Sequence, residues 1–180
     1  MDSLTLREYD VKYRIVLRER LRQQGIVRAG MTVLCLAARL GTEVKSFLDL
    51  GCFAVGIDLN PGKENKYVVY GDFHDCQFPT RSVDVVFTNS VDHVFDFDRF
   101  INETKRVLKP DGLFVLEIYK GEEEGVHARY YESVHWKKID DVLELFLKSG
   151  FRIIKTLDFN YPWHGQHISF ALNRISDHSQ

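Results

Sequence analysis

The sequence predicts an α/β fold in which a doubly wound, mostly parallel, seven-stranded sheet carries helices on both faces. Short apolar runs alternate with segments of helical periodicity, which favours a parallel sheet covered on both sides. The final two strands lack a helix between them, so the last strand is expected to run antiparallel. A chain of 180 residues is long enough for one domain with a substantial core.

The first half of the chain contains two expected helices. Residues 4–24 place apolar side chains at helical spacing, and Gly25 is a suitable stop. Thr42 and Glu43 open the second helix as cap and first-turn acid, and Gly51 ends it. The strands expected in this half span residues 33–37, 54–59, 67–70 and 83–88.

The second half continues the alternation. Asp96 is expected to cap a helix that reaches Leu108, and residues 109–112 read as a tight turn before a strand at 113–119. Residues 121–125 are expected to form a charged loop. A helix at 139–148 and strands at 151–159 and 167–172 complete the domain.

The chain divides into four segments of a single domain. We expect an N-terminal helical segment (1–30), a central α/β core (31–120), a segment with the C-terminal strands (121–173) and a tail (174–180). The net charge of −2, with scattered basic residues, disfavours a broad nucleic-acid surface, and no run approaches a membrane span. Three cysteines without metal spacing favour reduced thiols and a cytoplasmic location.

Polar or small residues follow four of the expected strands. They are the turn Ala37–Gly41, Asp58, the segment Gly71–Asp75 and the segment Asn89–His93. Ligands of open α/β sheets bind outside the carboxyl ends of the strands, so these four features are expected to share one site. Small residues before a helix let the backbone approach a ligand closely.

The two acids in this set suit an adenosine-containing ligand. Asp58 can accept hydrogen bonds from both hydroxyls of a ribose, and Asp72 can accept from an adenine amino group while Phe73 packs on the ring. Each also has a plain structural alternative, a surface carboxylate for Asp58 and a turn-forming residue for Asp72. The preceding strands favour the binding roles.

At these residues the sequence resembles the class I S-adenosylmethionine-dependent methyltransferases grouped as type 11. The resemblance covers about residues 31–120, and the segment Phe100–Ile118, which includes Arg106–Val115, is especially typical. It implies a Rossmann-like sheet and S-adenosyl-L-methionine as the cofactor. The cofactor-binding residues that it implies are Ala37, Ala38, Arg39, Gly41, Asp58, Leu59, Asp72, Phe73, Asn89 and Ser90.

The turn after the first strand departs from the family pattern. Cys35 stands where the family commonly has an acid, and Ala37 and Arg39 stand where it has glycines, so only Gly41 is kept. The Arg39 guanidinium has three readings: it contacts the carboxylate of the cofactor, it fills the pocket, or it points to solvent.

The resemblance implies methyl transfer to a small-molecule acceptor. His93 is the candidate base, with His74 and His135 as further candidates, although His93 also reads as an ordinary loop histidine. No metal site is expected. A methyltransferase-like binding or scaffold protein without catalysis is the alternative function, and a nicotinamide enzyme is a third.

Aromatic residues after the fifth expected strand are the candidates for acceptor binding. They are Tyr130, Tyr131, His135 and Trp136, for which core packing or a homodimer contact is the alternative. A second aromatic group, Tyr161, Trp163 and His164, is expected to be structural, with a smaller chance of shaping a pocket lip. The chain lacks the Asn/Asp-Pro-Pro-Tyr/Phe motif after Thr88, which argues against nucleic-acid bases as acceptors.

Overall fold

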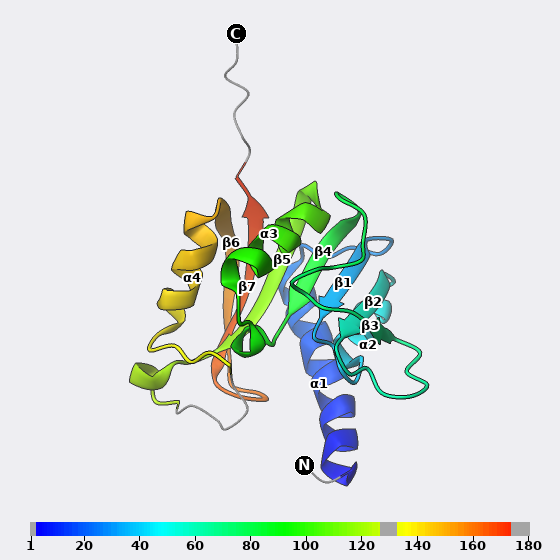
Figure 1. Ribbon diagram of the computed structural model, residues 1–180. Helices are drawn as coiled ribbons and strands as arrows, with labels where there is room; N and C mark the ends of the chain where they lie inside the picture. The colour runs from blue at the N-terminus through cyan, green and yellow to red at the C-terminus, as the bar shows by residue number, and fades with distance from the viewer. Residues whose placement is uncertain (1–2, 127–132, 174–180) are drawn as a thin grey trace.

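The computed structural model describes residues 3–126 and 133–173, and its centre is a seven-stranded sheet of order β3-β2-β1-β4-β5-β7-β6 (Figure 1). The parallel strands β1 to β5 are Thr32–Leu36, Phe53–Asp58, Val68–Tyr70, Val83–Thr88 and Leu108–Tyr119. β7 (Gly165–Leu172) runs antiparallel between β5 and β6 (Phe151–Phe159). The predicted α/β class and the antiparallel last strand are therefore confirmed.

Helices cover both faces of the sheet, as Figure 1 shows. α1 (Ser3–Gln24) and α2 (Thr42–Leu48) pack on one face, where they meet Val33 and Cys35 of β1. α3 (Phe97–Val107) and α4 (Ile139–Lys148) pack on the other, where they meet Leu34 and Leu36. Successive residues of a strand point to opposite faces, so one continuous apolar run supplies both cores.

Three local expectations need correction. Residues 109–112 do not separate two elements, because β5 already begins at Leu108; its pairing with β4 shifts from Val83↔Leu108 to Val85↔Leu113, so the segment forms an irregularity within the strand. Thr42 is the first residue of α2 rather than its cap, which is Gly41. Residues 122–124 form a 3-10 turn, where the Glu124 carboxylate accepts the backbone N–H groups of Gly121 and Ile139.

A buried polar cluster fastens α1 to the sheet. The Glu117 carboxylate on β5 is fully buried and accepts hydrogen bonds from the Tyr13 hydroxyl (2.6 Å), the Arg20 guanidinium (2.7 Å) and His167 Nδ1 (2.8 Å). Burial works to raise the pKa of Glu117, but these partners hold it below its ordinary value. The cluster therefore places the first turns of α1 beside the ends of β1 and β4.

The described residues contain no helix long and apolar enough to cross a membrane. Cys35, Cys52 and Cys76 are all buried and free, as expected for reduced thiols.

Candidate functional site

The polar strand ends meet where the order of the sheet reverses, between β1 and β4. Two cavities open there, and they share Ala37, Arg39 and His93 as a common wall. The Asp58 cavity has a volume of about 520 Å³ and is further lined by Leu59, Asn60, Gly71, Asp72, Phe73, His74, Phe95 and Ser133. The Glu43 cavity has a volume of about 310 Å³ and is further lined by Leu6, Tyr9, Ala38, Leu40, Thr42, Glu43, Asn89, Ser90, Asp92 and Trp163.

The turn from β1 to α2 explains which family glycine this chain keeps. Gly41 has a φ of 71°, and a Cβ there would come within 2.8 Å of the Tyr67 Cβ, so a side chain is excluded by conformation and by space. Ala37 also has a positive φ, 53°, which an alanine adopts only at some cost. Arg39 is not in this region, so its backbone does not require glycine.

Asp58 closes this turn against the end of β2. Its Oδ2 accepts the backbone N–H of Arg39 at 3.1 Å, and its Oδ1 accepts that of Asn60 at 2.7 Å. Each carboxylate oxygen has a further lone pair. The carboxylate is thus fixed in orientation on the wall of the Asp58 cavity, where two neighbouring hydroxyls can donate to it.

Asp72 is held in the same cavity by the residue two positions later. Its Oδ1 accepts both the backbone N–H of His74 (2.8 Å) and His74 Nδ1 (2.9 Å). Burial opposes ionisation, but these bonds hold the pKa of Asp72 below its ordinary value. His74 Nε2 accepts the backbone N–H of Asp96, so both ring nitrogens are engaged and His74 is a support for Asp72 rather than a base.

Glu43 occupies the Glu43 cavity as a buried carboxyl, with 7% of its surface exposed. It accepts a hydrogen bond from Asn89 Nδ2 at 3.0 Å, and the same nitrogen donates to the Tyr13 hydroxyl at 3.1 Å. Burial is the main reason that the pKa of Glu43 is raised to about 7. Asn89, expected to bind the cofactor, thus connects the cavity to the cluster around Glu117.

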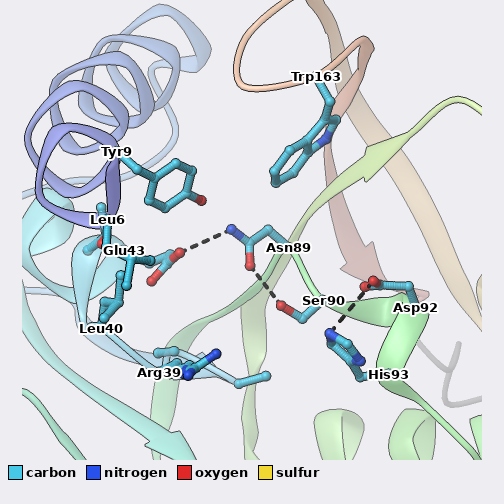
Figure 2. Close-up of a pocket in the computed structure, with 13 residues that line it drawn as sticks. Leu6, Tyr9, Arg39, Leu40, Glu43, Asn89, Ser90, Asp92, His93 and Trp163 are labelled. Carbon is cyan, nitrogen blue, oxygen red and sulfur yellow. Dashed lines mark hydrogen bonds and ion pairs between the residues drawn. The ribbon is translucent and has the colours of Figure 1, made fainter. Parts of the chain in front are cut away.

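Aromatic side chains from distant parts of the chain wall this cavity. Tyr9 comes from α1 and Trp163 from the turn between β6 and β7, and Figure 2 shows their rings above Asn89 on opposite sides. The indole N–H of Trp163 has no hydrogen-bond partner within residues 3–126 and 133–173. The two aromatic rings therefore form an apolar part of the Glu43 cavity, opposite the polar side chain of Asn89.

His93 lies on the wall that both cavities share. It ends the 3-10 helix η1 (Val91–His93), 48% of its side chain is exposed, and its Nε2 lies 3.7 Å from Asp92 Oδ2. Ser90, just before η1, donates its hydroxyl proton to Asn89 Oδ1 at 3.0 Å. The structure therefore brings His93, Asn89 and Ser90 to one place, as expected from the sequence.

The side chain of Arg39 is exposed at the boundary of the two cavities. Its backbone N–H and C=O are engaged with Asp58 and Asn65, whereas its guanidinium makes no hydrogen bond or ion pair with any described residue. Arg39 lines both cavities with an exposed side chain, so its guanidinium is accessible to an anionic group.

Of the acceptor residues expected from the sequence, the two that the structure describes, His135 and Trp136, are not at the walls of either cavity. Tyr130 and Tyr131 lie outside the described residues. Trp136 is buried in the α3/α4 core, where its indole N–H donates to the Tyr119 carbonyl oxygen at 3.0 Å, and His135 precedes it. The described lining instead includes Trp163, for which a structural role was favoured.

Sequence reasoning placed the Ala37–Gly41 turn and the Asn89–His93 segment at the site, but it missed Glu43 and Tyr9 as walls of the Glu43 cavity. Glu43 had one usable signal, an acid in the first turn after a strand-end turn, but that pattern also describes an ordinary helix start. Tyr9 belongs to an apolar stripe of a helix, a pattern that is typical of core residues. Trp163 follows β6, the edge strand that lies four places from β1 in the sheet order. These residues are brought together only by tertiary packing.

Comparisons with known proteins agree with the observed fold. Residues 34–116 match the family described as methyltransferase domain, a stretch that runs from β1 to the middle of β5. No curated protein matches the chain. The matched segment includes Asp58, Asp72 and Asn89.

Solved structures share the fold over most of the chain. A SAM-dependent methyltransferase from Aquifex aeolicus has a TM-score of 0.72 and 18% identity, covering 94% of this chain and 98% of its own. A protein from Pyrococcus horikoshii has a TM-score of 0.71 and 20% identity, covering 91% of both chains. The 1,6-didemethyltoxoflavin-N1-methyltransferase of Burkholderia thailandensis, with S-adenosylhomocysteine bound, has a TM-score of 0.71 and 16% identity, covering 95% of this chain and 81% of its own. Together they agree with the predicted resemblance: residues 34–116 match a methyltransferase domain, and the described chain shares the fold of these solved structures.

Proposed function

We propose that the protein transfers the methyl group of S-adenosylmethionine to a small-molecule acceptor, with the cofactor extended across both cavities. The observation that carries the proposal is Asp58, whose two carboxylate oxygens are oriented by backbone N–H groups at the end of β2. In this arrangement Asp58 binds the ribose hydroxyls. Asp72 accepts from the adenine amino group, and Phe73 packs on the ring.

The residues of the turn fit the rest of the cofactor. Gly41 and Ala37 keep the turn compact, so the methionyl part can pass along the backbone from the Asp58 cavity to the Glu43 cavity. The exposed guanidinium of Arg39 lies at that crossing and is proposed to pair with the methionyl carboxylate. Arg39 thereby takes a binding role that glycine cannot perform.

The cofactor supplies a methyl group already activated by the sulfonium, so the chain need only align the acceptor and exclude water. His93 stands on the wall between the two cavities and is proposed as the base for an acceptor that must lose a proton. Asp92 Oδ2 lies 3.7 Å from His93 Nε2 and is proposed to orient the imidazole ring.

A small acceptor is supported by the size of the Glu43 cavity, about 310 Å³, which resembles ligand pockets rather than a macromolecular groove. The Burkholderia relative binds 1,6-didemethyltoxoflavin, itself a small molecule. The buried free cysteines support a cytoplasmic location.

Two measurements test the proposal. Isothermal titration calorimetry should show that S-adenosylmethionine and S-adenosylhomocysteine bind the wild-type chain at micromolar concentration. Incubation with methyl-labelled S-adenosylmethionine and a fraction of small metabolites should then move label into a small product. No binding at millimolar cofactor would refute the proposal, and binding without any labelled product would favour a scaffold protein.

A further inference from the structure

Glu43 is a buried carboxyl that has no cationic partner in the described part of the chain. Only 7% of its surface is exposed, and the hydrogen bond from Asn89 uses Oε1. No lysine, arginine or histidine of residues 3–126 and 133–173 forms an ion pair with it. Burying an ionised carboxylate without a positive charge is costly, so the site gains stability when a cation enters.

The neighbouring cluster cannot supply that cation. Arg20, the nearest buried arginine in the chain of hydrogen bonds, is already paired with Glu117 at 2.7 Å. The Tyr13 hydroxyl donates its proton to Glu117, so Tyr13 must accept from Asn89, and the Asn89 amide group points one N–H at each neighbour. Asn89 is therefore the hydrogen-bond donor to both residues, and Glu43 faces the cavity as a hydrogen-bond acceptor.

The walls around Glu43 also favour positive charge. Figure 2 shows the Tyr9 and Trp163 rings on opposite sides of the space above Asn89, with Asp92 across the cavity. Faces of tyrosine and tryptophan attract ammonium groups, and a second acid strengthens the negative potential. The one arginine of the lining, Arg39, is exposed and lies below Leu40 in Figure 2, on the wall shared with the Asp58 cavity and away from the Tyr9 and Trp163 rings.

We propose that the Glu43 cavity is an ammonium-binding site, with Glu43 as the counter-ion and Tyr9 and Trp163 as aromatic walls. The inference rests on the proposed function, because that reaction supplies two sources of an ammonium group. One is the α-ammonium of the methionyl part of the cofactor, and the other is an amine acceptor. In both cases Asn89 and Tyr13 are positioning residues that hold the carboxylate toward the ligand.

The first arm of the test asks whether the ammonium belongs to the cofactor. Glu43→Gln keeps the acceptor for Asn89 but removes the charge. Titration calorimetry at pH 8 would compare S-adenosylhomocysteine with its desamino analogue, which lacks only the α-ammonium. If the cofactor is the source, the variant should bind S-adenosylhomocysteine about tenfold more weakly and bind the desamino analogue as the wild type does.

The second arm asks whether the ammonium belongs to the acceptor. Protein saturated with S-adenosylhomocysteine would be titrated with benzylamine and with benzyl alcohol, which differ in charge but little in shape. If the acceptor is the source, the wild type should prefer benzylamine by about tenfold, and Glu43→Gln should lose that preference. Tyr9→Leu should lower the same affinity several-fold in whichever arm is positive.

Exposed Glu144 on α4 provides the matched control, and Glu144→Gln should change neither arm. Thermal unfolding would verify that Glu43→Gln is folded, which is expected because it removes a buried charge. Two unchanged results would refute the ammonium site. Glu43→Gln would leave the difference in affinity between S-adenosylhomocysteine and its desamino analogue as in the wild type, and likewise the difference between benzylamine and benzyl alcohol. Failure of the wild type to bind S-adenosylhomocysteine at all would instead refute the proposed function.

Discussion

The two cavities are built in different ways. The Asp58 cavity takes its polar groups from the ends of adjacent parallel strands, and each acid is oriented by nearby backbone N–H groups, as Asp58 is by Asn60 and Asp72 by His74. The Glu43 cavity gathers side chains from α1, α2, the end of β4 and the β6–β7 turn. The first depends on strand order, whereas the second depends on how α1 packs.

Their acids differ accordingly. Backbone and imidazole donors keep the pKa of Asp72 low, so the Asp58 cavity has a fixed negative charge at neutral pH. Burial raises the pKa of Glu43 to about 7, so the charge of the second cavity changes with pH and with bound ligand. We therefore expect the charge of the Asp58 cavity, proposed to hold the adenosine, to stay constant near neutral pH. The charge of the Glu43 cavity, proposed to hold the reactive end of the cofactor, is expected to change with pH.

The largest loss of stability should come from removing Glu117, the centre of the hydrogen-bonded cluster that holds α1 beside the Glu43 cavity. Glu117→Ala removes the acceptor shared by Tyr13, Arg20 and His167, and it leaves the Arg20 charge buried without its partner. We expect a loss of about 3–5 kcal/mol in the free energy of unfolding, measured by urea denaturation. The exposed pair of Glu144 and Lys148 is the control, since Glu144→Ala should cost less than about 0.5 kcal/mol. Equal losses would show that the cluster is not what fastens α1.

A second effect is a pH dependence that only the Glu43 cavity should produce. The pKa of Glu43 is about 7 in the folded chain against an ordinary 4.5, so the folded state binds the proton more tightly. Proton binding at Glu43 therefore stabilises the folded state. This stabilisation is fully present below pH 4.5 and is lost as the pH rises through 7, a change of roughly 3 kcal/mol in the free energy of unfolding. Carboxyls with lowered pKa values, such as Glu117 and Asp72, lose their contribution only below their ordinary values, outside this window.

The measurement is urea denaturation of the ligand-free protein between pH 5 and 8, with Glu43→Gln as the reference. The stability of the wild type should fall relative to the variant as the pH rises. A difference that is flat across the window would mean that Glu43 is ionised throughout, and the contrast between the cavities would then disappear.

The next effect concerns the Asp58 cavity. Asp58→Ala should weaken S-adenosylhomocysteine binding by about 1–3 kcal/mol, because two ribose hydroxyls lose their acceptor. Asp58 also accepts the Arg39 backbone N–H, so Asp58→Asn is the companion variant that keeps the shape of the turn. Calorimetry with both variants, and with exposed Asp98→Ala as control, separates ligand binding from turn stability. Unchanged affinity in both Asp58 variants would show that the ribose assignment is wrong.

The sequence predicted the part of the molecule in which each role follows from local order. Asp58, Asp72 and Asn89 each follow an apolar run, and strand ends of a parallel sheet meet at one edge. The strand through Lys109–Gly112 was not predicted, because Pro110 and Gly112 are also typical of a turn and only pairing with β4 shows the irregularity.

Tyr9 and Glu43 of the Glu43 cavity could not be predicted for a different reason. Tyr9 follows the same helical spacing as buried Tyr13, and only the position of α1 against the sheet decides which of them faces a cavity. Glu43 has the sequence context of a helix start, and its burial depends on α1 covering α2. Propensity and spacing describe neither contact, since both join segments far apart in the chain.

The smallest effect is expected at Arg39, on the wall that joins the two cavities. If its guanidinium pairs with the methionyl carboxylate, Arg39→Gly should weaken S-adenosylhomocysteine binding by about 0.5–1 kcal/mol, since the side chain is exposed and screened. Binding of 5′-methylthioadenosine, which lacks the amino-acid group, should not change. The backbone of Arg39 is not in the region that favours glycine, so Arg39→Gly relieves no backbone strain. Ala37→Gly does relieve strain, because Ala37 has a φ of 53°. Tighter binding of both ligands by Arg39→Gly would show that the guanidinium obstructs the crossing, and the two cavities would then serve separate ligands rather than one extended cofactor.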